Sequence, residues 1–87
     1  MILNEVLLMR REVLFPKLST KTDQGVITEW LQPVDSQVKK GEVLYEVETE
    51  KAVHEVEVPF DGKVLEVKVV PGDEVFVDDV LAVFEVE

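Results

Sequence analysis

The sequence predicts an all-β domain built as a pseudo-twofold sandwich of two antiparallel sheets. Three observations support this prediction. Apolar and polar residues alternate with a period of two along most of the chain, as in VLYEVETEKAVHEVEV at residues 43–58. Turn-forming Gly, Pro, Asp and Ser residues interrupt the alternation at intervals. A shift of 37 positions also lays the first half of the chain on the second half.

The alternating runs define the expected strands. Six strands are predicted at residues 12–16, 25–32, 43–49, 52–58, 63–69 and 80–86, with two shorter ones at 38–39 and 75–77. Turns are expected at Gly41-Glu42, Pro59–Gly62 and Pro71–Asp73. In such turns proline presets φ, glycine permits a positive φ and aspartate caps neighbouring amides. Short connections of this kind join antiparallel hairpins and meanders.

The internal repeat predicts how the strands pack. The shift carries GVITEW at residues 25–30 onto GKVLEV at residues 62–67. Apolar and acidic positions of the next segment match as well: Val38, Val43, Leu44 and Glu48 fall on Val75, Val80, Leu81 and Glu85. Each half therefore has the same order of strand, turn, short strand and strand, and each half completes the other around one core.

Length and composition restrict the classes of protein. With 87 residues the chain forms one small domain without a deep cavity of its own, which argues against a self-sufficient enzyme. The absence of cysteine excludes disulfides, zinc-thiolate sites and cysteine nucleophiles. Residues 1–11 are interpreted as a loosely ordered lead-in and residues 12–87 as the domain. The lead-in resembles neither a secretory signal nor a membrane span, so a cytoplasmic protein is expected.

The charge balance restricts the partners. Nineteen acidic residues stand against nine basic ones, which gives a formal net charge of -10. A domain this acidic repels phosphate backbones and anionic membranes, so neither nucleic acid nor a membrane is an expected partner. A protein surface with a basic patch matches it better, although an acidic balance also serves solubility alone.

One lysine lies within an acidic run. Lys51 falls between the strands expected at 43–49 and 52–58, with so few residues between them that its ammonium group should point into water at a hairpin tip. In the repeat this tip corresponds to the end of the chain, so one end of the sandwich displays Lys51 and the other holds the termini. An exposed lysine is usually an ordinary surface residue, so its importance depends on its neighbours.

Those neighbours form a recognisable pattern. The run Glu48-Thr49-Glu50-Lys51-Ala52 follows G-x-x-L-x-x-V at residues 41–47. Further matching segments are FPKL at 15–18, GVITEW at 25–30, P-x-x-G-x-V at 59–64 and P-G-D-x-V at 71–75. Together they resemble the biotinyl/lipoyl-attachment domain family, in particular the lipoyl domains of acyltransferase components of 2-oxoacid dehydrogenase complexes. The resemblance covers residues 13–87 and implies a flattened β-barrel of two four-stranded antiparallel sheets, a barrel-sandwich hybrid.

The resemblance implies a carrier function without catalytic residues. Lys51 would bear lipoic acid as an amide, and this swinging arm would carry acyl groups and reducing equivalents between active sites. The implied partners are a lipoate ligase or lipoyl transferase, a 2-oxoacid decarboxylase, the acyltransferase core and dihydrolipoamide dehydrogenase. The domain itself is expected to be a monomer.

The residues beside Lys51 are candidates for recognition by the ligase or by partners. Glu50 stands where many family members have aspartate, which keeps the charge and lengthens the side chain. Ala52 leaves room for the arm, while Thr49 and Glu48 complete the turn; Glu48 could equally be the solvent-facing residue of a strand. The family often has Gly-Asp where this chain has Asp35-Ser36, and glycine where it has Ser19.

The loop at residues 19–24 is expected near the Lys51 turn. In the family this loop contributes to recognition by the decarboxylase component. In this chain the loop, STKTDQ, could also be a plain surface connection.

Two other functions share the predicted fold. A biotin carrier also modifies a hairpin lysine, but it flanks that lysine with methionines in an Ala-Met-Lys-Met pattern, whereas the methionines here are Met1 and Met9. An unmodified structural module of the same fold would leave Lys51 as a bystander. Other chemistry is not indicated. His54 has no serine or acid spaced to work with it, the glutamates near Lys51 lack the spacing of a metal site, and Trp30 is interpreted as a core or rim residue.

Overall fold

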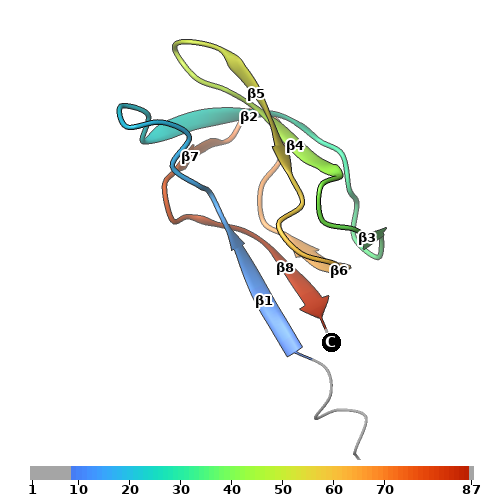
Figure 1. Cartoon of the computed structure of the whole chain (residues 1–87). Coiled ribbons are helices and arrows are strands. Elements are labelled where there is room, and N and C mark those ends of the chain that lie inside the picture. The colour runs from blue at the N-terminus through green and yellow to red at the C-terminus, as the bar shows by residue number, and fades with distance from the viewer. Residues whose placement is uncertain (1–8, 87) are drawn as a thin grey trace, which may run out of the picture.

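The computed structural model describes residues 9–86 and contains the predicted all-β architecture. Its eight strands are β1 (Met9–Leu14), β2 (Gln24–Trp30), β3 (Gln37–Val38), β4 (Val43–Glu48), β5 (Val53–Glu57), β6 (Gly62–Val67), β7 (Glu74–Phe76) and β8 (Val80–Val86). They form two four-stranded sheets, ordered β1-β8-β6-β3 and β5-β4-β2-β7 (Figure 1). Every strand pair is antiparallel. The predicted fold class and all eight predicted strands are confirmed.

The first strand begins three residues before the predicted boundary. The expected strand at 12–16 is observed as Met9–Leu14, because β8 extends far enough to pair Met9 with Val86 and Arg10 with Glu85. The Arg11 guanidinium lies 3.9 Å from the centre of the Phe60 ring, a cation–π contact that adds to this pairing. Residues 9–11 of the predicted lead-in are therefore part of the sheet, and the rest of it, residues 1–8, lies outside the described residues.

The repeat in the sequence is also a repeat in backbone geometry. The pairing of β2 with β4 shifts register between Ile27 and Glu29, and the pairing of β6 with β8 shifts between Val64 and Glu66, the equivalent residues. The Ile27 N–H donates to the Asp73 carbonyl at 2.9 Å, and the equivalent Val64 N–H donates to Ser36 at 3.0 Å. Bulges bend and twist strands, so both sheets curve in the same way and close around one core.

The repeat extends to unusual backbone conformations. Gly72 has φ +100°, and its equivalent, Asp35, has φ 77°. Gly41 has φ +97°, and its equivalent, Asp78, has φ 75°. Glycine adopts positive φ without steric penalty, whereas aspartate is merely among the side chains that tolerate it best. Each half thus has one glycine and one strained aspartate at equivalent pairs of turn positions.

The core lies between the sheets and is apolar. Its buried side chains come from both halves and from most strands: Val13, Phe15, Ile27, Val38, Leu44, Tyr45, Val47, Val58, Val64, Val75, Leu81, Ala82 and Phe84. Aromatic pairs extend it, with Trp30 stacked on Tyr45 at 5.3 Å and Phe60 edge-on to Phe84 at 5.5 Å between ring centres. Within residues 9–86 no charged side chain is buried.

The two ends of the sandwich differ in what they present. The hairpin of β4 and β5 forms one end, and the start of β1 lies beside the end of β8 at the other (Figure 1). The Lys51 turn therefore lies opposite the two ends of the described chain, Met9 and Val86, while the termini themselves lie outside the described residues. In the part of the chain that the structure describes, no helix has the length and apolar character needed to span a membrane.

Candidate functional site: the Lys51 turn and its groove

Lys51 lies at the tip of a tight hairpin. The last strand pair is Glu48 with Val53, after which the Thr49 N–H donates to the Ala52 carbonyl at 2.9 Å. Only Glu50 and Lys51 extend beyond this bond, and both are exposed. Among residues 9–86 no ion pair involves the Lys51 ammonium group. The predicted position of Lys51 is therefore the observed one, and its Nζ is free to accept a covalent group.

Thr49 holds the turn through its side chain. Its Oγ1 donates to the Ala52 carbonyl at 3.2 Å and lies 3.4 Å from both the Lys51 and the Ala52 backbone nitrogens. A threonine hydroxyl that bonds to backbone groups two and three residues ahead stabilises a turn. Ala52 follows as an exposed small residue at the exit. The predicted recognition roles of Thr49 and Ala52 stay predictions, because the structure assigns them only a place in the turn.

A groove runs beside the turn, here called the hairpin groove. Glu48, Thr49 and Glu50 line one part of it, and the loop at residues 19–24 and strands β2 and β7 line the rest: Lys21, Thr22, Asp23, Gln24, Gly25, Val26 and Glu74. The loop therefore lies near the Lys51 turn, as the resemblance implied. Glu48 is an exposed residue of β4 that lines this groove, and its role in recognition stays a prediction.

The loop at residues 19–24 is itself a small ordered turn. Ser19 and Thr22 form an antiparallel bridge, and their hydroxyls are 2.7 Å apart. The Lys21 N–H donates to Ser19 Oγ at 3.3 Å, much as the Lys51 N–H approaches Thr49 Oγ1. Lys17 and Asp23 form an ion pair at the base of the loop. Lys21 is thus a second exposed lysine in a turn capped by a hydroxyl group, and it lines the hairpin groove beside the Lys51 turn.

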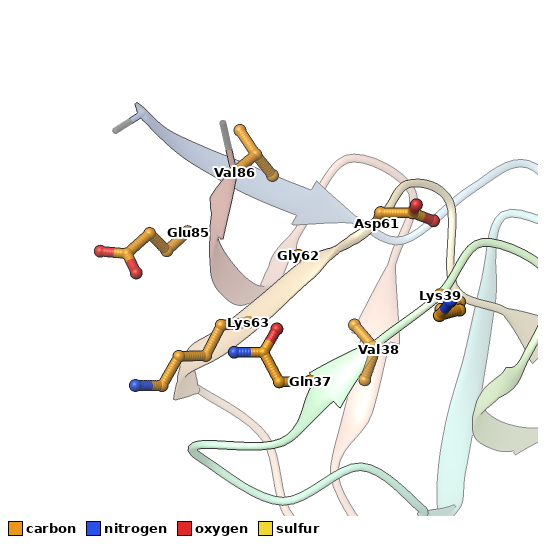
Figure 2. A pocket seen from close by; sticks show the side chains of 8 residues that line it. All are labelled: Gln37, Val38, Lys39, Asp61, Gly62, Lys63, Glu85 and Val86. Carbon is orange, nitrogen blue, oxygen red and sulfur yellow. The ribbon is translucent and has the colours of Figure 1, made fainter. Parts of the chain in front are cut away.

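A second groove lies at the equivalent place in the other half, here called the terminal groove. It is lined by Gln37, Val38, Lys39, Asp61, Gly62, Lys63, Glu85 and Val86 (Figure 2). Both grooves have a volume of about 560 Å³, and Gly62 occupies the place that Gly25 has in the hairpin groove. In Figure 2 the side chains of Lys63 and Glu85 project on the same side. The backbone repeat therefore sets the shape of both grooves.

His54 contributes to the turn, which the sequence analysis missed. Its Nε2 lies 3.3 Å from Thr49 Oγ1, and its ring is half-buried. The signal was present in the alternation, because Val47, Thr49 and His54 all fall on one face of the hairpin once Val47 pairs with His54. The sequence indicated only that His54 lacks a catalytic partner, and the contact with Thr49 was overlooked.

Other candidate sites remain without support. No group of three or more potential metal ligands occurs among residues 9–86. Trp30 is part of the core edge, as predicted, since it stacks on Tyr45 and its Nε1 donates to the Gln32 carbonyl at 2.7 Å. The Tyr45 hydroxyl is buried and has no hydrogen-bond partner in the described part of the chain. Burial raises the pKa of Tyr45 well above its ordinary value of 10.0.

Comparisons with known proteins agree with this geometry. A family model described as "Biotin-requiring enzyme" matches residues 11–84. The dihydrolipoyllysine-residue acetyltransferase component of the acetoin cleaving system of Bacillus subtilis is 36% identical over 67 residues, 77% of this chain and 17% of that protein. The dihydrolipoyllysine-residue succinyltransferase component of the 2-oxoglutarate dehydrogenase complex of Staphylococcus saprophyticus is 39% identical over 72 residues, 83% of this chain and 17% of that protein.

A solved structure of similar size supports the same assignment. The solution structure of the lipoyl domain of the 2-oxoglutarate dehydrogenase complex from Azotobacter vinelandii superposes with a TM-score of 0.68 at 26% identity. The match covers 87% of this chain and 95% of that domain. The chain therefore belongs to the biotinyl/lipoyl-attachment family. Its sequence relatives include several acyltransferase components named for a dihydrolipoyllysine residue, and its structural relative is a lipoyl domain, so it is a lipoyl-type domain.

Proposed function

We propose that Lys51 carries a lipoyl group in amide linkage and that the domain presents this group to partner enzymes. The observation that carries the proposal is the position of Lys51: it is exposed at the tip of a hairpin in a chain of the lipoyl type, with no ion-pair partner among residues 9–86. An amide-linked lipoyl group supplies a disulfide that accepts and releases acyl groups and electrons. The residues of this chain hold the attachment point away from the body of the domain.

The length of the arm suits exchange between distant active sites. A lysine side chain and a lipoyl chain together extend on the order of 12 Å beyond the backbone. Tethering on the domain raises the effective concentration of the arm at each site it can reach. A domain that only carries the arm needs no catalytic residue of its own.

The proposed partners follow from the relatives. These are named as components of acetoin, pyruvate and 2-oxoglutarate systems, and this chain spans 11% to 20% of the acyltransferase components among them. We propose exchange with a 2-oxoacid decarboxylase, an acyltransferase core and dihydrolipoamide dehydrogenase, after lipoylation by a ligase or lipoyl transferase. With a net charge of -10 the domain favours partners with basic docking surfaces. A cytoplasmic location stays a prediction, which cell fractionation would check.

The flanking residues favour lipoate over biotin. A biotin carrier of this fold places methionines on both sides of the lysine, whereas Glu50 and Ala52 flank Lys51. The exposed carboxylate of Glu50 gives the tip a charge that a methionine would not provide. The proposal therefore includes lipoate as the cofactor.

Parallel ligase reactions test this proposal. The protein is incubated with a lipoate ligase, lipoate and ATP, and separately with a biotin ligase, biotin and ATP, and each product is weighed intact. One lipoyl adduct and no biotin adduct is the expected result. A biotin adduct alone would assign the domain to the biotin carriers, and no adduct on a folded sample would indicate an unmodified module.

A further inference from the structure

We propose that His54 is a positioning residue for Lys51 and acts through the hydroxyl of Thr49. This inference rests on the proposed role of Lys51 as the lipoyl acceptor and adds a determinant of how well that lysine is presented. The His54 ring lies 3.3 Å from Thr49 Oγ1, on the half-buried side of the hairpin. His54 is also the single histidine of the chain.

The hydrogen bonds of the turn depend on the Thr49 side chain. In a fully paired hairpin the residues on either side of the tip exchange two backbone bonds. Here the Thr49 N–H donates to the Ala52 carbonyl at 2.9 Å, but the Ala52 N–H approaches the Thr49 hydroxyl at 3.4 Å. The Lys51 N–H approaches the same oxygen at 3.4 Å. The side of the turn that bears Lys51 is therefore closed by a side chain rather than by the backbone.

The Thr49 hydroxyl can serve the turn only in one rotamer. Threonine has a stiff χ1 because its Cβ is branched, but a half-exposed residue can still exchange rotamers. The contact with His54 Nε2 favours the rotamer that also reaches Lys51 and Ala52, since all three partners converge on one oxygen. His54 is held in turn by β5, where its backbone pairs with Val47. The ring thus connects the conformation of the tip to the paired strands.

This arrangement predicts an effect on recognition rather than on the modification chemistry. An enzyme that attaches the lipoyl group binds the turn in one conformation. If the free turn adopts that conformation less often, the apparent KM rises in proportion and kcat changes little. Loss of one net hydrogen bond shifts the conformational equilibrium roughly fivefold and therefore raises the apparent KM by up to about fivefold.

Four single variants and one double variant test the inference. Thr49→Val and His54→Leu each remove one partner of the contact. Thr49→Ser keeps the hydroxyl, and His54→Gln replaces the ring nitrogen with an amide that can still hydrogen-bond. Lipoylation kinetics are measured with each unmodified domain as substrate, well below its Tm, and amide hydrogen exchange of Lys51 and Ala52 is followed by NMR. Thr49→Val and His54→Leu should each raise KM, by up to about fivefold, and speed exchange at both amides. The two conservative variants should have the KM and the amide exchange of the wild type. The double variant of Thr49→Val and His54→Leu should have the same KM as Thr49→Val alone, because both changes break the same contact.

Each outcome separates this inference from the proposed function. If the wild type is lipoylated and His54→Leu keeps the wild-type KM and amide exchange, the positioning role is wrong and the carrier function stands. A KM that rises equally in His54→Gln and His54→Leu would also contradict it, because loss of packing alone would then explain the effect. A wild type that accepts no lipoate would overturn the proposed function, and this inference with it.

Discussion

Gly25 and Gly62 occupy equivalent places in the two halves of the domain, but the chain continues differently beyond their grooves. Next to Gly25, β4 leads into the hairpin that displays Lys51. Next to Gly62, the equivalent strand β8 pairs with the start of β1 and the described chain ends. The two grooves have the same volume and matched backbone bonds. The proposed function of the hairpin end therefore depends on the residues that close that end and not on the repeated backbone.

The grooves also differ in charge. The hairpin groove has one cation, Lys21, against a set of carboxylates, Asp23, Glu48, Glu50 and Glu74. The terminal groove balances two cations and two carboxylates: Lys39, Lys63, Asp61 and Glu85. The excess of negative charge thus lies beside Lys51. We expect a partner that docks at the hairpin end to present basic side chains there.

The largest expected difference between the ends concerns lysine modification. Lys51→Arg should abolish lipoylation, because arginine offers no nucleophilic amine, and should leave stability within about 0.5 kcal/mol since the side chain is exposed. Intact mass after the ligase reaction and urea unfolding measure the two effects. Matched controls are Lys21→Arg in the same groove and Lys63→Arg in the terminal groove, which should be lipoylated fully. A residual adduct in Lys51→Arg would show that another lysine is used.

A smaller difference concerns the two groove glycines. A Cβ on Gly62 would lie 2.6 Å from the Glu85 carbonyl oxygen, whereas a Cβ on Gly25 would lie 2.6 Å from a Val47 methyl group. Backbone yields less readily than a side-chain methyl, so Gly62→Ala should lower the free energy of unfolding by about 3 kcal/mol and Gly25→Ala by about 1 to 2 kcal/mol. Urea unfolding of both variants gives the order. Equal losses of unfolding free energy would mean that the backbone at Glu85 moves aside as readily as the side chain of Val47.

The next prediction compares Tyr45 with its equivalent in the repeat, Ala82. Both are fully buried, but Tyr45 brings a hydroxyl that has no partner among the described residues. Tyr45→Phe keeps the ring on Trp30 and removes that polar group, so it should raise the free energy of unfolding by about 1 kcal/mol. Thermal and urea unfolding at neutral pH measure this gain. A loss of stability would indicate that the hydroxyl is satisfied in solution.

The same residue predicts a dependence of stability on pH. Burial raises the pKa of Tyr45 in the folded state, so above pH 10.0 the unfolded chain releases the tyrosine proton while the folded chain keeps it. The unfolded state then binds fewer protons, and stability falls as pH increases, by at most about 1.4 kcal/mol per pH unit from this group. Tyr45→Phe should lack this contribution. Parallel slopes for the two proteins between pH 10 and 11 would contradict the assignment.

The smallest expected effects concern the turns with positive φ. Asp35→Gly and Asp78→Gly place at each position the residue that its repeat equivalent has, Gly72 or Gly41. Glycine relieves the strain of a positive φ in the folded state, but it also gives the unfolded chain more conformational entropy. The first effect is only slightly larger, so each change should stabilise the domain by about 0.5 kcal/mol. The reverse changes, Gly72→Ala and Gly41→Ala, should destabilise it by about 1 kcal/mol. Urea midpoints in the opposite order would mean that the aspartates make bonds worth more than the strain.

Much of the fold and the position of Lys51 followed from the sequence, because both depend on local patterns. Alternation and turn residues predict each strand. The short interval between the strands on either side of Lys51 predicts that this residue lies at the tip of a hairpin. The predicted start of the first strand, at residue 12, was wrong. The observed start depends on backbone pairing of Met9 with Val86, which is distant in the sequence. The contact of His54 with Thr49 and the unpartnered Tyr45 hydroxyl depend on side-chain rotamers inside a packed structure. No period in the sequence encodes those rotamers.

The most direct test of the account is to locate the lipoyl group on the protein after reaction with the ligase. Peptide mapping by tandem mass spectrometry covers all lysines, at both ends of the sandwich, in a single experiment. The account predicts one lipoyl group, on Lys51, with Lys21 in the hairpin groove and Lys39 and Lys63 in the terminal groove unmodified. A lipoyl group on any of those three, with Lys51 free, would contradict the claim that the hairpin tip is the functional end.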